Sequence, residues 1–210
     1  MLYTISPQEM KRIEQRFMAE TKAGSLTLME RAAAHVADAA MPFLWHGAKL
    51  LVLAGTGNNG GDGLAAARML LSRFETLHCV IWQLAGKQSP ETIEQTKRLK
   101  EFKERVDTIT TDGEVPPIPE GCACAIDALF GTGLSRPLTG AALTMAENLN
   151  ATDLPVIAVD IPSGLDGGNG YPPEGGAAIN ADVTVTFHRP KDGLYLGDGP
   201  DACGTVIVGD

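Results

Sequence analysis

The chain has 210 residues, of which 44% are hydrophobic and 20% are charged, so it has the composition of a globular protein and is predicted to form a single domain over residues 1–210. The formal net charge of −9 at pH 7 disfavours nucleic acid as a partner, because an acidic surface repels phosphates. The sequence contains no long apolar run and begins without a basic and apolar leader, so we expect a cytoplasmic protein with no membrane partner.

Two helices are predicted before residue 49. Residues 6–9 read Ser-Pro-Gln-Glu, which is a capping box with proline at the first helical position, and Met10, Ile13 and Phe17 then recur at helical spacing. A second helix is predicted to open at Thr27 by the same capping logic and to run through an alanine-rich stretch to Ala40.

From residue 49 onward, short apolar runs alternate with helical patterns. The runs lie at residues 50–54, 77–82, 124–129, 156–159, 183–187 and 205–208, and the helical patterns at residues 61–74, 90–105 and 139–150. Strands that are apolar on both faces are typical of a buried parallel sheet with helical crossovers. The predicted fold class is therefore α/β, a Rossmann-like three-layer α/β/α sandwich with a mostly parallel central sheet, in which ligands bind beyond the carboxyl ends of the strands.

The loop after the first predicted strand holds five glycines in residues 55–63, and amides that enter a helix N-terminus suit a phosphate. The stretch fits G-x-G-x-x-G, but a dinucleotide dehydrogenase also needs an acid at the end of the second strand, where this chain has Gln83. A phosphate-binding P-loop is excluded because Gly61 and Asp62 replace its Lys-Ser/Thr pair. A glycine-rich turn without a ligand is the structural alternative.

Two later strands also run into polar loops. Asp127 ends an apolar strand, where a carboxylate needs a cation, hydrogen-bond donors or a shifted pKa, although it could simply cap the next turn. Asp160 follows the next strand, in a loop that contains Ser163. Because the carboxyl ends of parallel strands open on one rim, the three loops are expected to meet, where their oxygens suit a hard cation and their amides suit a phosphorylated substrate.

At these residues the sequence resembles the NAD(P)H-hydrate epimerase family, the YjeF N-terminal domain. The resemblance rests on five motifs, namely Leu28-Met29-Glu30-Arg31-Ala32, Asn58-Asn59-Gly60-Gly61-Asp62-Gly63, residues 127–137, residues 160–166, and Thr186-Phe187 with Lys191 and Gly193. It implies interconversion of the R and S forms of NADHX and NADPHX, which are hydrated nicotinamide nucleotides, as a metabolite repair reaction. It also implies a homodimer, and since bifunctional relatives carry a dehydratase domain, the chain could be the N-terminal part of a longer bifunctional protein.

The resemblance further implies a set of site residues. Substrate contacts are expected from Asn58, Asn59, Gly60, Gly61, Asp62, Gly131, Thr132, Gly133, Leu134, Ser135, Arg136, Pro137 and Asp160. A potassium ion is expected on Asn59, Asp127 and Ser163, whose hard oxygens suit it. Asp192 stands where relatives commonly have proline, which bears on the geometry of the neighbouring Lys191.

The implied chemistry needs an acid and a base. The hydrate carries a hydroxyl at C6 beside the ring nitrogen, so C6 inverts if hydroxide leaves to an iminium and returns on the other face. Asp127 is predicted to serve as both acid and base, because burial can raise its pKa while a bound cation opposes that shift. If Asp127 is purely a cation ligand, a bound water or Lys191 would have to move the proton.

Two other functions fit parts of the sequence. An NAD(P)-dependent oxidoreductase is supported by the glycine pattern and weakened by the absence of the ribose-binding acid and of a catalytic Tyr-Lys or His pair. A non-catalytic nucleotide-binding or interaction module is the other alternative, and the joint presence of Asn59, Asp127 and Ser163 argues against it.

Overall fold

The computed structural model describes residues 3–21 and 24–209, so Met1, Leu2 and Asp210 of the predicted domain lie outside the described residues. The strands are β1 (Lys49–Ala54), β2 (His78–Leu84), β3 (Val106–Thr111), β4 (Cys122–Ala128), β5 (Val156–Val159), β6 (Val183–Phe187) and β7 (Thr205–Gly209). They form one sheet in the order β3-β2-β1-β4-β5-β6-β7, and every neighbouring pair is parallel. The predicted α/β class is confirmed, with a sheet that is parallel throughout.

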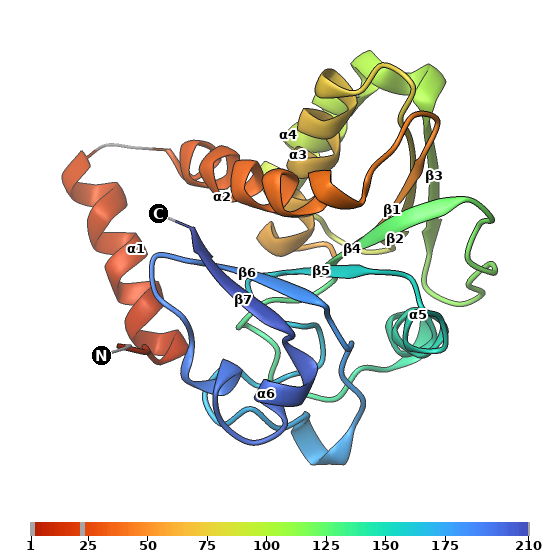
Figure 1. Ribbon diagram of the computed structural model, residues 1–210. Helices are drawn as coiled ribbons and strands as arrows, with labels where there is room; N and C mark the ends of the chain where they lie inside the picture. Colours follow the sequence, from red (N-terminus) through yellow and green to blue (C-terminus); the bar gives the residue numbers. More distant parts are fainter. Residues whose placement is uncertain (1–2, 22–23, 210) are drawn as a thin grey trace.

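Helices cover both faces of this sheet. They are α1 (Pro7–Thr21), α2 (Ser25–Ala40), α3 (Asn58–Arg73), α4 (Pro90–Leu99), α5 (Gly140–Asn150) and the short α6 (Gly199–Ala202). Figure 1 shows α2, α3 and α4 on one side of the sheet and α5 on the other. Along β1, Leu50 and Val52 pack in the cluster under α2 and α3, whereas Leu51 and Leu53 pack in the cluster under α5. This alternation explains why the strand is apolar at every position.

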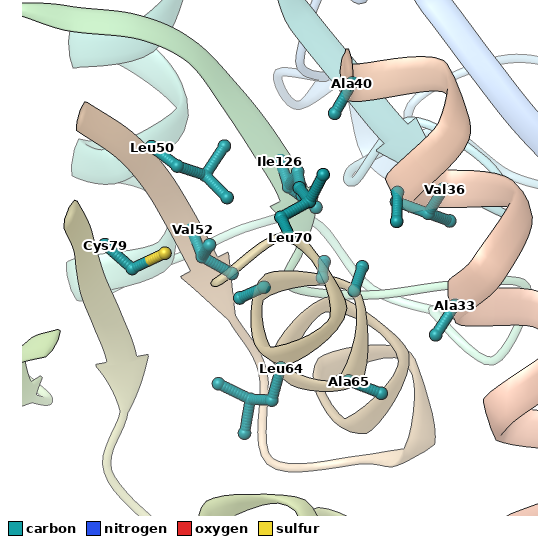
Figure 2. Packing of buried hydrophobic residues seen from close by; sticks show 14 of the residues in the cluster. Ala33, Val36, Ala40, Leu50, Val52, Leu64, Ala65, Leu70, Cys79 and Ile126 are labelled. Carbon is teal, nitrogen blue, oxygen red and sulfur yellow. The ribbon is translucent and has the colours of Figure 1, made fainter. Parts of the chain in front are cut away.

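Small residues bring α3 close to the sheet and to α2. Figure 2 shows Ala33 and Val36 of α2 facing the helix that carries Ala65, with Val52 and Ile126 of the sheet beneath it. A Cβ atom at Gly63 would lie 2.5 Å from the Cβ of Ala128, so the first turns of α3 rest directly on the end of β4. The helix that begins at the glycine-rich segment is thus held tightly against the strand that ends in Asp127.

The helix starts were predicted with mixed success. The capping box at α1 is confirmed, because the amide of Glu9 donates to the hydroxyl of Ser6 and the carboxylate of Glu9 accepts from Ser6. The expected cap at Thr27 is wrong: α2 begins at Ser25 after Gly24, and the amide of Thr27 donates to the carbonyl of Gly24. A glycine backbone in extended conformation therefore takes the place of a side-chain cap.

Two other boundaries differ from the predicted ones. Strand β3 was not predicted, because its sequence Val-Asp-Thr-Ile-Thr-Thr is polar and largely exposed, as suits an edge strand with one neighbour. Helix α4 ends at Leu99 and continues as a 3-10 segment, η2 (Lys100–Arg105), rather than as one helix to Arg105.

Helix α1 lies outside the sandwich. Figure 1 shows it to one side, next to the C-terminal end of β7. It is joined to the body by a parallel bridge between Ile5 and Lys191, in which Ile5 donates to the carbonyl of Pro190 and the amide of Asp192 donates to Ile5. Helix α1 thereby comes to wall the carboxyl-end side of the sheet.

Candidate functional site

The candidate site begins where the strand order reverses. Strands β1 and β4 are neighbours in the sheet, but the chain proceeds from β1 toward β2 and from β4 toward β5. Ligands of open parallel sheets bind at such a switch point, outside the carboxyl ends of the strands. The two loops that leave β1 and β4 touch there, because the amide of Gly55 donates to the carbonyl of Ala128 at 2.9 Å.

The segment after β1 is helical rather than a loop. Helix α3 begins at Asn58, three residues before the predicted start, and its N-cap residue Gly57 provides no side-chain cap. No described residue accepts a hydrogen bond from the amides of Asn58, Asn59 or Gly60. These unpaired amides and the positive end of the helix dipole favour an anion at this position.

The glycines of this segment are required by packing. A Cβ at Gly60 would lie 2.0 Å from the carbonyl oxygen of Gly55, and a Cβ at Gly61 would lie 2.4 Å from the Cε of Met29. The amide of Gly61 is already bonded to the carbonyl of Gly57. The close approach that these two positions need is therefore to the protein itself, whereas the sequence had suggested approach by a ligand.

Three loops meet at Gly131. A Cβ at this position would lie 3.1 Å from Oδ1 of Asn59 and 3.3 Å from Oδ2 of Asp160. Asn59 comes from α3 after β1, Gly131 from the loop after β4, and Asp160 from the end of β5. The structure thus brings the three predicted loops together, and glycine at position 131 leaves the space between the two polar side chains open.

Asp127 and Ser163 form a buried pair beneath this point. Both are 0% exposed. Ser163 donates its hydroxyl to Oδ1 of Asp127 at 2.6 Å and its amide to Oδ2 at 2.7 Å, and the amide of Leu129 donates to Oδ1 at 3.3 Å. Burial raises the pKa of Asp127 to about 6, although the hydrogen bonds from Ser163 and Leu129 act in the opposite direction.

The pair also connects two loops. The hydroxyl of Ser163 accepts a hydrogen bond from the amide of Phe130 at 2.9 Å, so the turn after β4 is fixed to the turn after β5. Asn59 is less committed, because no described residue pairs with its buried Nδ2. Among the described residues no three His, Cys, Asp or Glu side chains gather as in a transition-metal site.

Asp160 is held by a buried lysine. The Nζ of Lys191 lies 2.5 Å from Oδ1 of Asp160, and it also donates to the hydroxyl of Thr186 at 3.0 Å and to the carbonyl of Phe187 at 3.3 Å. Lys191 is 2% exposed and the Asp160 side chain 16%. Asp160 has a φ of 69°, a left-handed conformation that is uncommon outside glycine and that clusters at functional sites. Asp192 therefore does not prevent Lys191 from entering the site.

A cavity of about 330 Å³ lies between α1 and this rim. Its walls are mainly the apolar side chains of Met10, Ile13, Phe17, Leu28 and Met29, together with polar groups from Glu14, Asn58 and Asp62. The sequence gave no signal for Glu14, because α1 reaches the cavity only through the bridge at Ile5. The apolar face of α1 thus lines the cavity.

Three carboxylates interact across this region. Burial raises the pKa of Asp62 well above its usual value of 3.8, and the negative charges of Asp160 and Glu14 raise it further. Burial also raises the pKa of Glu14, where Asp160 acts in the same direction and Lys191 in the opposite one. The side chain of Asp62 accepts no hydrogen bond from a described residue.

The remaining predicted residues lie along the loop between β4 and α5. Gly133, Ser135 and Arg136 are exposed, whereas Leu134 packs against the apolar cluster under α5. Thr132 and Pro137 are partly buried. At the end of β2, Gln83 is 3% exposed, so the position of the ribose-binding acid of a dehydrogenase holds a buried amide.

Comparison with protein families gives one match that spans most of the chain. The family described as YjeF-related protein N-terminus matches residues 25–193. An NAD(P)H-hydrate epimerase of Limosilactobacillus fermentum is 35% identical over 206 residues, which cover 98% of this chain and 95% of that protein. The enzyme of the same name from Weissella koreensis is 32% identical over 98% of this chain and 90% of its own length.

Longer relatives and a solved structure agree with this match. The bifunctional NAD(P)H-hydrate repair enzyme Nnr of Hyperthermus butylicus is 38% identical over 87% of this chain, which spans 34% of that enzyme. The crystal structure of yeast ynu0, YNL200c, superimposes with a TM-score of 0.81 at 27% identity, covering 99% of this chain and 88% of the yeast chain.

Proposed function

The chain belongs to the family of YjeF-related protein N-termini, and we propose on that premise that it is an NAD(P)H-hydrate epimerase that interconverts the R and S forms of NADHX and NADPHX in metabolite repair. The observation that carries the proposal is the meeting of Asn59, Gly131 and Asp160 at the switch point. Three loops with polar side chains around an open glycine suit a nucleotide better than a turn without a ligand would require.

The substrate is proposed to lie along two neighbouring segments. Its diphosphate is assigned to the unpaired amides at the start of α3, at Asn58, Asn59 and Gly60, because they form an uncapped helix N-terminus. Gly61 and Asp62 complete that turn. On the other side the loop of residues 131–137 offers exposed backbone and the free guanidinium face of Arg136, while Asp160 reaches the same opening.

A potassium ion is proposed as the resident cation, held by Asn59, Asp127 and Ser163. The fit rests on the donor set, because the Asp127 carboxylate is fully buried among neutral donors and Asn59 has an amide nitrogen without a partner. A bound cation would compensate the buried negative charge and bring the loops after β1, β4 and β5 into one arrangement.

The acid–base role of Asp127, which the sequence suggested, stays a prediction. Its carboxylate has no exposed surface and already accepts three hydrogen bonds from Ser163 and Leu129, so a substrate in the opening at Gly131 would not touch it. These features suit a cation ligand that organises the loops. Proton transfer suits a carboxylate that reaches the opening.

The test is direct. Purified protein is incubated with R-NADHX, and in parallel with S-NADHX, and the epimers are separated by chromatography over time. We expect both reactions to converge on one ratio of epimers, at a rate proportional to protein concentration. Hydride transfer with NADH and a panel of carbonyl acceptors is assayed alongside, because it would reveal an oxidoreductase. Binding of the hydrate without conversion would instead identify a binding module.

A homodimer is proposed as the working assembly, and the predicted cytoplasmic location is kept. All four cysteines are free, as expected for a protein of a reducing compartment. No helix among the described residues is long and apolar enough to cross a membrane. Sedimentation equilibrium at micromolar concentration measures the assembly, and a single species of 22.1 kDa would contradict the dimer. Fusion to a dehydratase, as in bifunctional relatives, is examined by sequencing the full gene.

A further inference from the structure

We propose that Asp62 and Asp160 form a two-carboxylate acid–base pair that works on opposite faces of the substrate ring, with Lys191 as the positioning residue of Asp160. The inference rests on the proposed function and assigns its proton-transfer groups. It moves the acid–base role from Asp127 to two carboxylates that lie at the opening. It also gives a role to a buried lysine that substrate binding and cation binding both leave unused.

The two carboxylates approach from two sides of β4. Asp62 belongs to α3, which follows β1, and Asp160 ends β5, while β4 and its Gly131 loop lie between these strands. Asp62 lines the cavity under α1, and Oδ2 of Asp160 faces the open position at Gly131. They are near enough for their charges to interact. A flat ring placed over Gly131 would therefore meet one carboxylate on each face.

The surroundings of Asp160 stabilise the carboxylate form. Its Oδ1 is 2.5 Å from the Nζ of Lys191, which is 2% exposed and has its other hydrogen bonds to Thr186 and Phe187. A lysine buried this deeply needs a negative partner, so the ion pair fixes both the charge and the orientation of Asp160. Its Oδ2 is left to accept a proton from water at the opening.

The surroundings of Asp62 favour the protonated form. It has no cation beside it and accepts no hydrogen bond from a described residue, and the nearby charges of Asp160 and Glu14 are both negative. Burial is the main reason that the pKa of Asp62 is raised. Two carboxylates whose surroundings drive their protonation apart can divide the roles of acid and base.

The step balances without an added reagent. Asp62 gives its proton to the hydroxyl at C6, the C6–O bond breaks with both electrons on oxygen, and water leaves while the ring nitrogen forms the iminium. A second water attacks C6 from the opposite face and gives a proton to the Asp160 carboxylate. One water leaves, one enters, and one proton has passed from Asp62 to Asp160. The reverse epimerisation, or exchange with solvent, resets the pair.

The test follows solvent oxygen. Reactions are run in water enriched in oxygen-18 from each pure epimer, and the label in both epimers is measured by mass spectrometry after subtraction of a reaction without protein. The wild type should place the label in the product epimer. Asp62→Asn and Asp160→Asn should each slow inversion by about 10²- to 10⁴-fold, the range of general acid–base groups. Each should still exchange label into one starting epimer, and the two variants into different ones.

Lys191 is tested through its partner. Lys191→Met should show the exchange pattern of Asp160→Asn, and the double variant Asp160→Asn/Lys191→Met should invert no more slowly than Asp160→Asn alone, because both changes remove one function. The double variant also removes the unpaired buried charge that either single change would leave. Asp153→Asn, an exposed acid at the other end of the sheet, is the matched control and should keep the wild-type rate and pattern.

Three outcomes would overturn the inference. They are wild-type inversion by either aspartate variant, loss of exchange from both epimers alike in both variants, and absence of label from the wild-type product. Further slowing of inversion when Lys191→Met is added to Asp160→Asn would remove the positioning role of Lys191. A wild type that converts neither epimer refutes the proposed function itself, which distinguishes the two failures.

Discussion

The hydroxyl of Ser163 lies 2.6 Å from Oδ1 of Asp127, and both residues are completely buried. The amide of the same serine reaches Oδ2 at 2.7 Å, so one residue of the loop after β5 satisfies both oxygens at the end of β4. Its hydroxyl also accepts from the amide of Phe130. The relative position of these two loops is therefore fixed by a single side chain below the opening at Gly131.

Ser163→Ala should destabilise the fold. It removes the donor to a buried carboxylate and leaves the amide of Phe130 without its acceptor, so the free energy of unfolding should fall by about 1.5–3 kcal/mol. Urea denaturation in choline chloride buffer measures the change. Ser135→Ala, at an exposed position, should change stability by less than about 0.5 kcal/mol. Equal effects of the two substitutions would contradict the role given to Ser163.

Potassium should stabilise the protein through Asp127. A ligand that binds only the folded state adds about 2.7 kcal/mol at 100 times its Kd, so the Tm should rise with KCl and remain unchanged with choline chloride at equal ionic strength. In Asp127→Asn the KCl-dependent rise should disappear, because the charge that attracts the cation is gone. A rise of the same size in the variant would assign the cation to another place.

Gly61→Ala should cost stability rather than substrate affinity alone. Its Cβ would lie 2.4 Å from Met29 and 3.0 Å from Thr92, so α2 and α4 would have to move away from the start of α3. Overpacking of this kind costs about 1–3 kcal/mol. Gly113→Ala, where nothing lies within 4 Å, is the matched control. Thermal unfolding of both variants decides whether the glycine serves packing.

Asp62→Asn should stabilise the protein at neutral pH. Because the pKa of Asp62 is raised in the folded state above its usual value of 3.8, the folded state binds the proton more tightly than the unfolded state. Stability is therefore lost as pH rises from about 4 through the folded pKa. Asparagine carries no such charge, so the gain in Tm should be larger at pH 7.5 than at pH 4.5. A gain that is constant with pH would show that Asp62 is not desolvated.

The sequence by itself determined the fold class and the three loops. Strands such as β1, in which Leu50 to Ala54 are all apolar, identify themselves because a parallel sheet buries both faces. Glycine density and the acids at strand ends are likewise local signals, and the switch-point rule places them on one rim. Edge strand β3 escaped detection because it has one neighbour and stays polar.

Only the tertiary structure decided what each of these residues contacts. The pairing of Lys191 with Asp160, the bonds from Ser163 to Asp127 and the approach of Glu14 to Asp62 all join segments far apart in the chain. Residue type and spacing cannot specify such pairs, because they depend on how α1, α3 and the strand ends pack together. Packing likewise decides that Gly60 and Gly61 face the protein, and burial decides that Asp127 has no surface open to a ligand while Asp160 does.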